Sequence, residues 1–186
     1  MPSPLELLAE EAAGCTRCKL AGLGRTQVVV SRGDPGSALM FVGEGPGAEE
    51  DKLGEPFVGR SGKLLDRLVA EEMGLERDAF YVCNVVQCRP PGNRDPEPDE
   101  IEACRPYLER KVELIGPRVI VTLGNFASKL LLDTKDGITK LRGRSYPFRT
   151  GVLIPTFHPA AVLRGGGEPM AQMRADLIRA KQALAA

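Results

Sequence analysis

The 186-residue sequence predicts an α/β fold in which helices cover both faces of a mostly parallel sheet. Two observations support this prediction. Short apolar runs recur along the chain, each bounded by turn residues as a buried strand should be. Segments with the periodicity of a helix separate these runs at least three times, without an internal repeat or a low-complexity tract. At this length we expect one domain that spans residues 1–186.

The composition is that of an ordinary globular protein, with 42% hydrophobic and 27% charged residues and a formal net charge of zero. No apolar run approaches the roughly 18 to 20 residues that cross a bilayer, and none resembles a secretory signal. We therefore expect a cytoplasmic monomer with no membrane partner. Arginine outnumbers lysine 17 to 8 and the chain has 15 prolines, which fits a thermophilic source.

The predicted elements follow in order along the chain. The first helix begins at the capping Ser3 and runs into Gly14. Apolar runs predict strands at residues 26–31, 38–42, 79–86, 118–123 and 152–157. Helical periodicity predicts helices at residues 61–74, 98–115, 125–132 and 168–185. We expect a basic loop or hairpin at residues 137–150 and a flexible link at the three glycines 165–167.

The stretch from residue 39 to residue 62 is the centre of this organisation. Its buried strand breaks into the turn GEGPG at residues 43–47, where glycine allows a sharp turn and a close approach to a ligand. Open α/β sheets bind ligands at this carboxyl edge. A second glycine-flanked segment, GEPFVGRSG at residues 54–62, holds Phe57. That ring either anchors the loop in the core or stacks on a flat ligand such as a base.

Four of the five cysteines are spaced as in a metal site. Cys15 and Cys18 form a CxxC unit, Cys88 follows a strand in a proline-rich loop, and Cys104 lies in the next helix. Four thiolates from three segments suit a structural zinc ion or a [4Fe–4S] cluster, and the spacing does not decide between them. A redox CxxC is the other alternative. Cys83 alternates with apolar residues, which predicts a buried core thiol.

His158 is the only histidine and directly follows the last predicted strand. Because the carboxyl ends of parallel strands meet at one edge of a sheet, we expect the turn at residues 43–47, Asn84 and His158 to form one polar pocket. Asn84 can both donate to and accept from the edge of a base. His158 can donate to a developing oxyanion.

Together, these motifs resemble the family 4 uracil-DNA glycosylases, the iron–sulfur class found in bacteria and archaea. The matching pieces follow the family's order over nearly the whole chain, and the set is highly specific although each piece alone is weak. They are Cys15-x2-Cys18, GEGPG at 43–47, GEPFVGRSG at 54–62, the strand 81–86 with CRPPGNR at 88–94, Cys104, and HPA at 158–160 with Leu163 and Arg164.

The resemblance implies a three-layer α/β/α fold around a central, mostly parallel four-stranded sheet. It implies a structural [4Fe–4S] cluster held by Cys15, Cys18, Cys88 and Cys104. It further implies a DNA repair enzyme whose partner is uracil-containing DNA, single- or double-stranded. Such an enzyme hydrolyses the N-glycosidic bond of deoxyuridine, releases uracil and leaves an abasic site for base excision repair.

The resemblance also implies roles for single residues. Phe57 would stack on the flipped uracil, and Asn84 would read its O4 and N3–H and thereby exclude cytosine. His158 would donate a hydrogen bond to uracil O2 as the bond breaks. Leu163 and Arg164 would enter the minor groove, fill the gap and hold the strand.

Two glutamates are candidates for the group that activates water. The best-known uracil glycosylases place an aspartate in the loop after the first strand, and Gly45 stands at that place here. Glu44 or Glu50 would take the role, with Asn93 assisting in the substrate site. The structural alternative for Glu50 is a carboxylate at a helix start. The backbone of Glu44, Gly45 and Pro46 would line the pocket.

Two other functions stay open. A cysteine-bound metal and the basic strip Lys140, Arg142, Arg144 and Arg149 would also fit a protein that binds nucleic acid without catalysis. The alternative is that these four basic residues belong to a solvated loop that binds no phosphate. The GEGPG turn would also fit a hydrolase of small nucleotides, although the chain lacks the Lys-Ser/Thr of a P-loop.

Overall fold

A computed structural model of the protein describes all residues 1–186. Its sheet has six strands in the order β1-β3-β2-β4-β6-β5. The four inner strands are parallel, while β1 and β5 pair antiparallel at the two edges. The strands are β1 (Arg32–Gly33), β2 (Leu39–Gly43), β3 (Tyr81–Asn84), β4 (Val119–Leu123), β5 (Tyr146–Phe148) and β6 (Gly151–Thr156). The expected sheet of four strands is therefore corrected to six.

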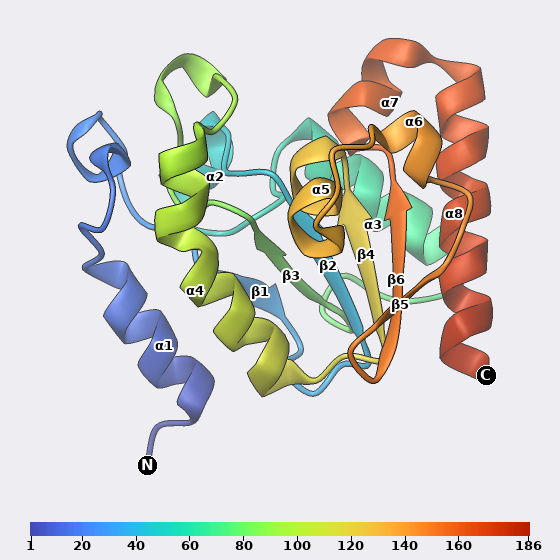
Figure 1. Ribbon diagram of the computed structural model, residues 1–186, viewed down its shortest axis with the longest axis horizontal. Helices are drawn as coiled ribbons and strands as arrows, with labels where there is room; N and C mark the ends of the chain where they lie inside the picture. Colours follow the sequence, from blue (N-terminus) through green and yellow to red (C-terminus); the bar gives the residue numbers. More distant parts are fainter.

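Helices cover both faces of the sheet (Figure 1). They are α1 (Pro4–Ala13), α2 (Ala48–Leu53), α3 (Arg60–Met73), α4 (Pro98–Ile115), α5 (Asn125–Leu132), α6 (Ile138–Leu141), α7 (Pro159–Gly165) and α8 (Gly167–Ala185), with short 3-10 turns at Lys19–Gly22 and Pro91–Asn93. α3, α7 and α8 pack together on one face. α4 and α5 cover the other face, and α1 packs on the outside of α4 (Figure 1).

The alternation of side chains along β2 divides the core in two. Leu39 and Phe41 join the cluster under α3 and α8, while Met40 and Val42 join the cluster under α4 and α5. A third, smaller cluster lies between α1 and α4 and includes Cys88. Both faces of the inner strands are therefore buried, as expected for a parallel sheet.

The expected strand at residues 26–31 is wrong. This segment bonds to side chains and to a loop instead of to a neighbouring strand. Thr26 N donates to the carboxylate of Asp51, and Val29 N donates to Gln87 O. Strand pairing begins only at Arg32. Apolar alternation describes the burial of these valines correctly but does not reveal their partners.

Two loop expectations also need correction. The glycines 165–167 are not a flexible link, because α7 ends at Gly165 and α8 begins at Gly167, with Gly166 alone turning the chain at φ 77°. The basic segment expected as a loop or hairpin at residues 137–150 instead holds the short helix α6 and the edge strand β5, which pairs with β6 beyond the segment. No helix is both long and apolar enough to cross a membrane.

Candidate active site

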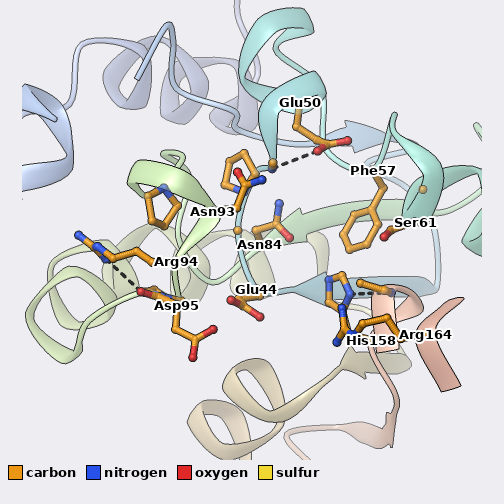
Figure 2. Close-up of a pocket in the computed structure, with 17 residues that line it drawn as sticks. Glu44, Glu50, Phe57, Ser61, Asn84, Asn93, Arg94, Asp95, His158 and Arg164 are labelled. Carbon is orange, nitrogen blue, oxygen red and sulfur yellow. Dashed lines mark hydrogen bonds between the residues drawn. The ribbon is translucent and has the colours of Figure 1, made fainter. Parts of the chain in front are cut away.

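A cavity of about 430 Å³ opens at the carboxyl edge of the parallel strands (Figure 2). Its walls come from the turn after β2, the loop that holds Phe57, the end of β3 with the loop that follows it, and the start of α7. The lining side chains include Glu44, Glu50, Phe57, Ser61, Asn84, Asn93, Arg94, Asp95, His158 and Arg164, together with Gly45 and Pro46. All the expected catalytic and substrate-binding residues thus lie around one cavity.

The floor of the cavity depends on the missing side chain of Gly43. Gly43 and Asn84 are register partners at the ends of β2 and β3. A Cβ atom at Gly43 would lie 2.5 Å from both Asn84 Oδ1 and Phe57 Cζ. Only glycine at this position lets the amide and the aromatic ring come together above the strand ends.

Asn84 has the properties of a binding residue. The side chain is 2% exposed, and its Oδ1 is buried with no hydrogen-bond partner in the protein. A buried acceptor without a partner costs about 1 to 3 kcal/mol, so natural proteins rarely keep one without use. A ligand that donates a hydrogen bond in the cavity would satisfy it.

Phe57 is held in a strained position above this floor. Its φ of 56° lies in the left-handed region, which is uncommon for an aromatic residue. The start of α3 passes so close that a Cβ atom at Gly62 would lie 1.9 Å from Phe57 O. The ring is 6% exposed and belongs to the core cluster while also lining the cavity, so both roles weighed for it are compatible.

Glu50 ties the two glycine-rich loops to each other. One carboxylate oxygen accepts from Gly47 N at 3.0 Å (Figure 2). The other accepts from Val58 N at 2.9 Å and from Gly59 N at 2.7 Å. These three backbone donors engage both oxygens. The contacts favour a positioning role at the start of α2, the alternative that the sequence left open, over activation of water.

We expect Glu50→Gln to lower the free energy of unfolding by about 2 kcal/mol, because an amide group cannot accept from donors on both sides. Thermal unfolding measures this effect. Glu49→Gln, at an exposed neighbour on the same helix, is the matched control and should change little. A variant with unchanged stability and a greatly reduced turnover would instead support direct catalysis by Glu50.

His158 is held in one tautomer. It caps α7, and its Nδ1 accepts from the backbone N–H of Ala160 at 3.1 Å. Nδ1 therefore carries no proton, and the proton of the neutral ring is on Nε2. Burial lowers the pKa of His158 to about 4, and the charge of Arg164 acts in the same direction while Glu50 opposes it. The ring centroid lies 5.6 Å from that of Phe57. A neutral N–H donor thus stands beside the aromatic ring.

The single imidazole allows a direct check of this state. In protein without a histidine tag, the only side-chain imidazole signals in a ¹⁵N spectrum belong to His158. We expect the Nε2–H tautomer at neutral pH and a titration midpoint near 4 rather than at the ordinary 6.5. Because the folded pKa is the lower one, the associated stability is complete above about pH 6.5 and is lost as the pH falls toward 4. A midpoint at 6 or above would contradict the assignment.

The carboxylates of Glu44 and Asp95 line the cavity and form no hydrogen bond or salt bridge within the protein. Burial raises the pKa of Glu44, and the charge of Asp95 raises it further, while Arg164 lowers it. In the view of Figure 2, Asp95 lies on the side of the cavity away from Phe57, and Glu44 lies between Asp95 and His158. A Cβ atom at Gly45 would lie 2.7 Å from Val86 Cγ2, so a longer side chain there requires Val86 to move. Because position 45 has little room for a side chain, Glu44 supplies the only carboxylate of the turn at residues 43–47.

Hydrogen bonds from two arginine side chains hold the loop after β3 in place. Arg94 donates to both oxygens of the buried Glu100, each at 2.8 Å, and to Asp95 O at 3.0 Å. Asn93, at φ 57°, accepts from Arg89 Nε at 2.7 Å. These contacts set the wall that carries Asn93 and Asp95.

The two residues expected to contact DNA differ in their position relative to the cavity. Arg164 lines the cavity, whereas Leu163 does not line it and is 41% exposed. Of the basic strip, Arg142 is neutralised by Asp176 at 2.9 Å, and Lys140 pairs with Asp136 at 3.1 Å. The strip does not line the cavity.

Cys15, Cys18, Cys88 and Cys104 line a second, smaller cavity behind the wall of the first. All four are free thiols, and no group of His, Cys, Asp or Glu side chains is arranged to hold a single metal ion. Burial raises the pKa of the Cys104 thiol to about 11 and also raises that of Cys88. Cys83 is wholly buried in the core outside this cavity, as expected.

Sequence reasoning missed Ser61, Arg94 and Asp95 as lining residues. Ser61 and Arg94 stood within the quoted motifs at residues 54–62 and 88–94, which was the available signal. Asp95 has no such signal, because its place depends on how the proline-rich loop folds back.

Comparisons with known proteins agree with the resemblance. The uracil DNA glycosylase superfamily matches residues 30–181. The type-4 uracil-DNA glycosylase of Sulfurisphaera tokodaii is 48% identical over 167 residues, covering 86% of this chain and 76% of that protein. The proteins of the same name from Thermotoga maritima and Saccharolobus solfataricus are 49% and 44% identical, and each alignment covers 86% of this chain and 83% or 77% of the relative.

Proposed function

Because the chain belongs to the type-4 uracil-DNA glycosylases of the uracil DNA glycosylase superfamily, we propose that it excises uracil from DNA. The reaction is hydrolysis of the N-glycosidic bond of deoxyuridine, which releases uracil and leaves an abasic site. We further propose that the enzyme acts as a monomer. We propose both single- and double-stranded DNA as substrates, since the target base must leave the stack in either case and a single strand spares the cost of unpairing.

The observation that carries the proposal is the unsatisfied Oδ1 of Asn84 at the floor of the cavity. It would accept from uracil N3–H, and the amide nitrogen would donate to O4. Cytosine has an unprotonated N3 and a 4-amino group, which reverses this pattern, so it would leave the buried acceptor unpaired. The Phe57 ring would cover a face of the base.

His158 would stabilise the leaving group. When the bond between C1′ and N1 breaks, its electron pair stays on uracil, and negative charge develops on O2. Nε2–H of the neutral imidazole would donate to that oxygen. A proton already on Nε2 and fixed by the contact at Nδ1 requires no rearrangement during the reaction.

Glu44 is the proposed water-activating group. A water molecule adds to C1′ and transfers a proton to the carboxylate, whose pKa is raised by burial and by Asp95. The same negative charge would favour the cationic sugar in the transition state. Glu50 would act by holding Phe57's loop.

We propose that the four cysteines hold a structural [4Fe–4S] cluster. Four thiols from three segments around one cavity fit the thiolate ligands that such a cluster needs. The cluster would supply no step of the hydrolysis. Its role would be to join the segment of Cys15 and Cys18 to α4 and to the loop that begins at Cys88 and continues into the cavity wall.

At the rim, Arg164 would contact the DNA backbone, and the exposed Leu163 would fill the gap that the flipped nucleotide leaves. Both lie on α7, whose first residue follows His158. The DNA contact and the leaving-group contact would therefore be set by one short helix.

The proposal is tested with a labelled oligonucleotide that carries one uracil, either single-stranded or paired with guanine or adenine. After incubation and alkali, we expect a strand break at the uracil in each case and none at cytosine in a matched oligonucleotide. Stoichiometric binding without any break would replace the enzyme by the nucleic-acid-binding alternative. Absorption at about 400 nm with elemental analysis decides between the cluster and zinc.

A further inference from the structure

The two buried cations of the protein differ in how their charge is balanced. Arg32 is 7% exposed and pairs with Asp66 at 2.8 Å. Lys111 on α4 is wholly buried, and its Nζ donates only to two neutral oxygens, Val30 O and Gln87 Oε1, each at 2.6 Å. An ammonium group buried without a counter-ion is costly. An anionic group close to Lys111 would remove this cost.

The acidic groups that face Lys111 are thiols. Burial lowers the pKa of Lys111, and Cys83 and Cys104 are the titratable neighbours whose negative charge, once they are ionised, acts in the opposite direction. Cys104 lies seven residues before Lys111, which is two helical turns along the same face of α4. Of these two thiols, only that of Cys104 lines the cysteine cavity.

Gln87 connects the lysine to this cavity. Its side-chain oxygen accepts from Lys111 Nζ, and Gln87 lines the cysteine cavity together with Cys104. The residue is 2% exposed and lines the cavity, yet its Nε2 is buried without an acceptor. An unused buried donor is a second sign that an electron-rich group belongs in the cavity.

A metal centre with thiolate ligands would supply the negative charge that the ammonium of Lys111 and the unpaired amide donor of Gln87 lack. Four thiolates around either a [4Fe–4S]²⁺ core or Zn²⁺ carry a net charge of minus two. On the other side of the cavity, Arg25 Nη1 donates to Cys88 Sγ at 3.2 Å. Lys111 and Arg25 would together balance the centre.

We propose that Lys111 is the buried counter-charge of the thiolate metal centre, linked to it through Gln87, with Arg25 as the second cation. This inference rests on the metal centre proposed above. It assigns Lys111 no part in base excision, and its effect is on the retention and the reduction potential of the centre. Reduction adds a negative charge, so a nearby cation makes it more favourable.

The test uses the holoprotein and three variants. Lys111→Met removes the charge. Gln87→Glu keeps Lys111 and neutralises it with a carboxylate at the position of its present acceptor, which also covers the case in which Lys111→Met does not fold. Val112→Ala is the matched control, because Val112 is the next residue of α4, is 2% exposed and carries no charge. Circular dichroism verifies folding.

We measure the loss of absorption at about 400 nm in EDTA with air, and the midpoint potential of the cluster. We expect both charge variants to lose the cluster about tenfold faster than wild type, and to reduce less readily by a factor of about ten, which is 59 mV for one electron. Val112→Ala should keep the wild-type potential. If the centre is zinc, the charge variants should bind Zn²⁺ about tenfold more weakly in competition with EDTA.

Two results would overturn the proposal. Wild-type retention and potential in a folded Gln87→Glu variant would show that the charge of Lys111 does not matter to the centre. Equal effects of Val112→Ala and Lys111→Met on both readouts would reduce Lys111 to a packing residue. A wild-type protein free of iron and zinc by elemental analysis would instead remove the metal centre itself, and with it this inference.

Discussion

Replacing Asn84 with alanine is expected to reduce kcat/KM for uracil release by about 10⁴-fold. The buried Oδ1 has no partner in the protein, so its hydrogen-bonding capacity is free for the substrate alone. Without it, uracil N3–H and O4 would be desolvated in the cavity and left unpaired. The measurement is single-turnover cleavage of a uracil oligonucleotide followed by alkali.

A loss of folding would imitate this result, so the variant must be compared with a suitable control. Asn125→Ala removes another asparagine that follows a parallel strand, but one that caps the backbone N–H of Ile138 outside the cavity. It should retain wild-type turnover. If Asn84→Ala keeps its fold and releases uracil within a factor of ten of wild type, the assignment of the base-reading site is wrong.

Replacing His158 with alanine is expected to reduce kcat by about 10²- to 10³-fold with a smaller change in KM. The hydrogen bond from Nε2 strengthens only as charge develops on uracil O2, so it acts on the transition state more than on binding. His158→Gln, which offers an amide N–H donor, should recover part of the loss.

The pH dependence separates this role from proton donation by an imidazolium. With the pKa of His158 lowered to about 4, we expect no loss of activity from this residue between pH 8 and pH 6. An activity that rises toward pH 5 in wild type and becomes flat in His158→Gln would identify a protonated histidine as the donor and refute the neutral form.

The four inner strands could be predicted from sequence because buried parallel strands are short apolar runs that end in turn residues. The edge strands could not. β1 has two residues and β5 has three, too few for a pattern. The false strand at residues 26–31 shows the converse, since Val28 and Val30 pack with residues of α1 and α4 although the segment pairs with no strand.

The convergence of Asn84, His158 and the turn at residues 43–47 was predictable, because the carboxyl ends of parallel strands meet by geometry. For Glu50, the place at a helix start was one of the two predicted alternatives, but its contacts were not predictable. Its three backbone donors come from two separate loops, which only the tertiary structure brings together. The contacts of Arg94 and Lys111 likewise depend on where α4 packs, which local periodicity does not contain.

The central claim is that this pocket releases uracil as a free base. The most direct test is chromatographic measurement of free uracil released from an oligonucleotide with one uracil, alongside the abasic sites formed, for wild type and Asn84→Ala. We expect one uracil for each abasic site with wild type and almost none with the variant. Undiminished release from a folded Asn84→Ala, or no release from wild-type protein that binds the oligonucleotide, would contradict the account.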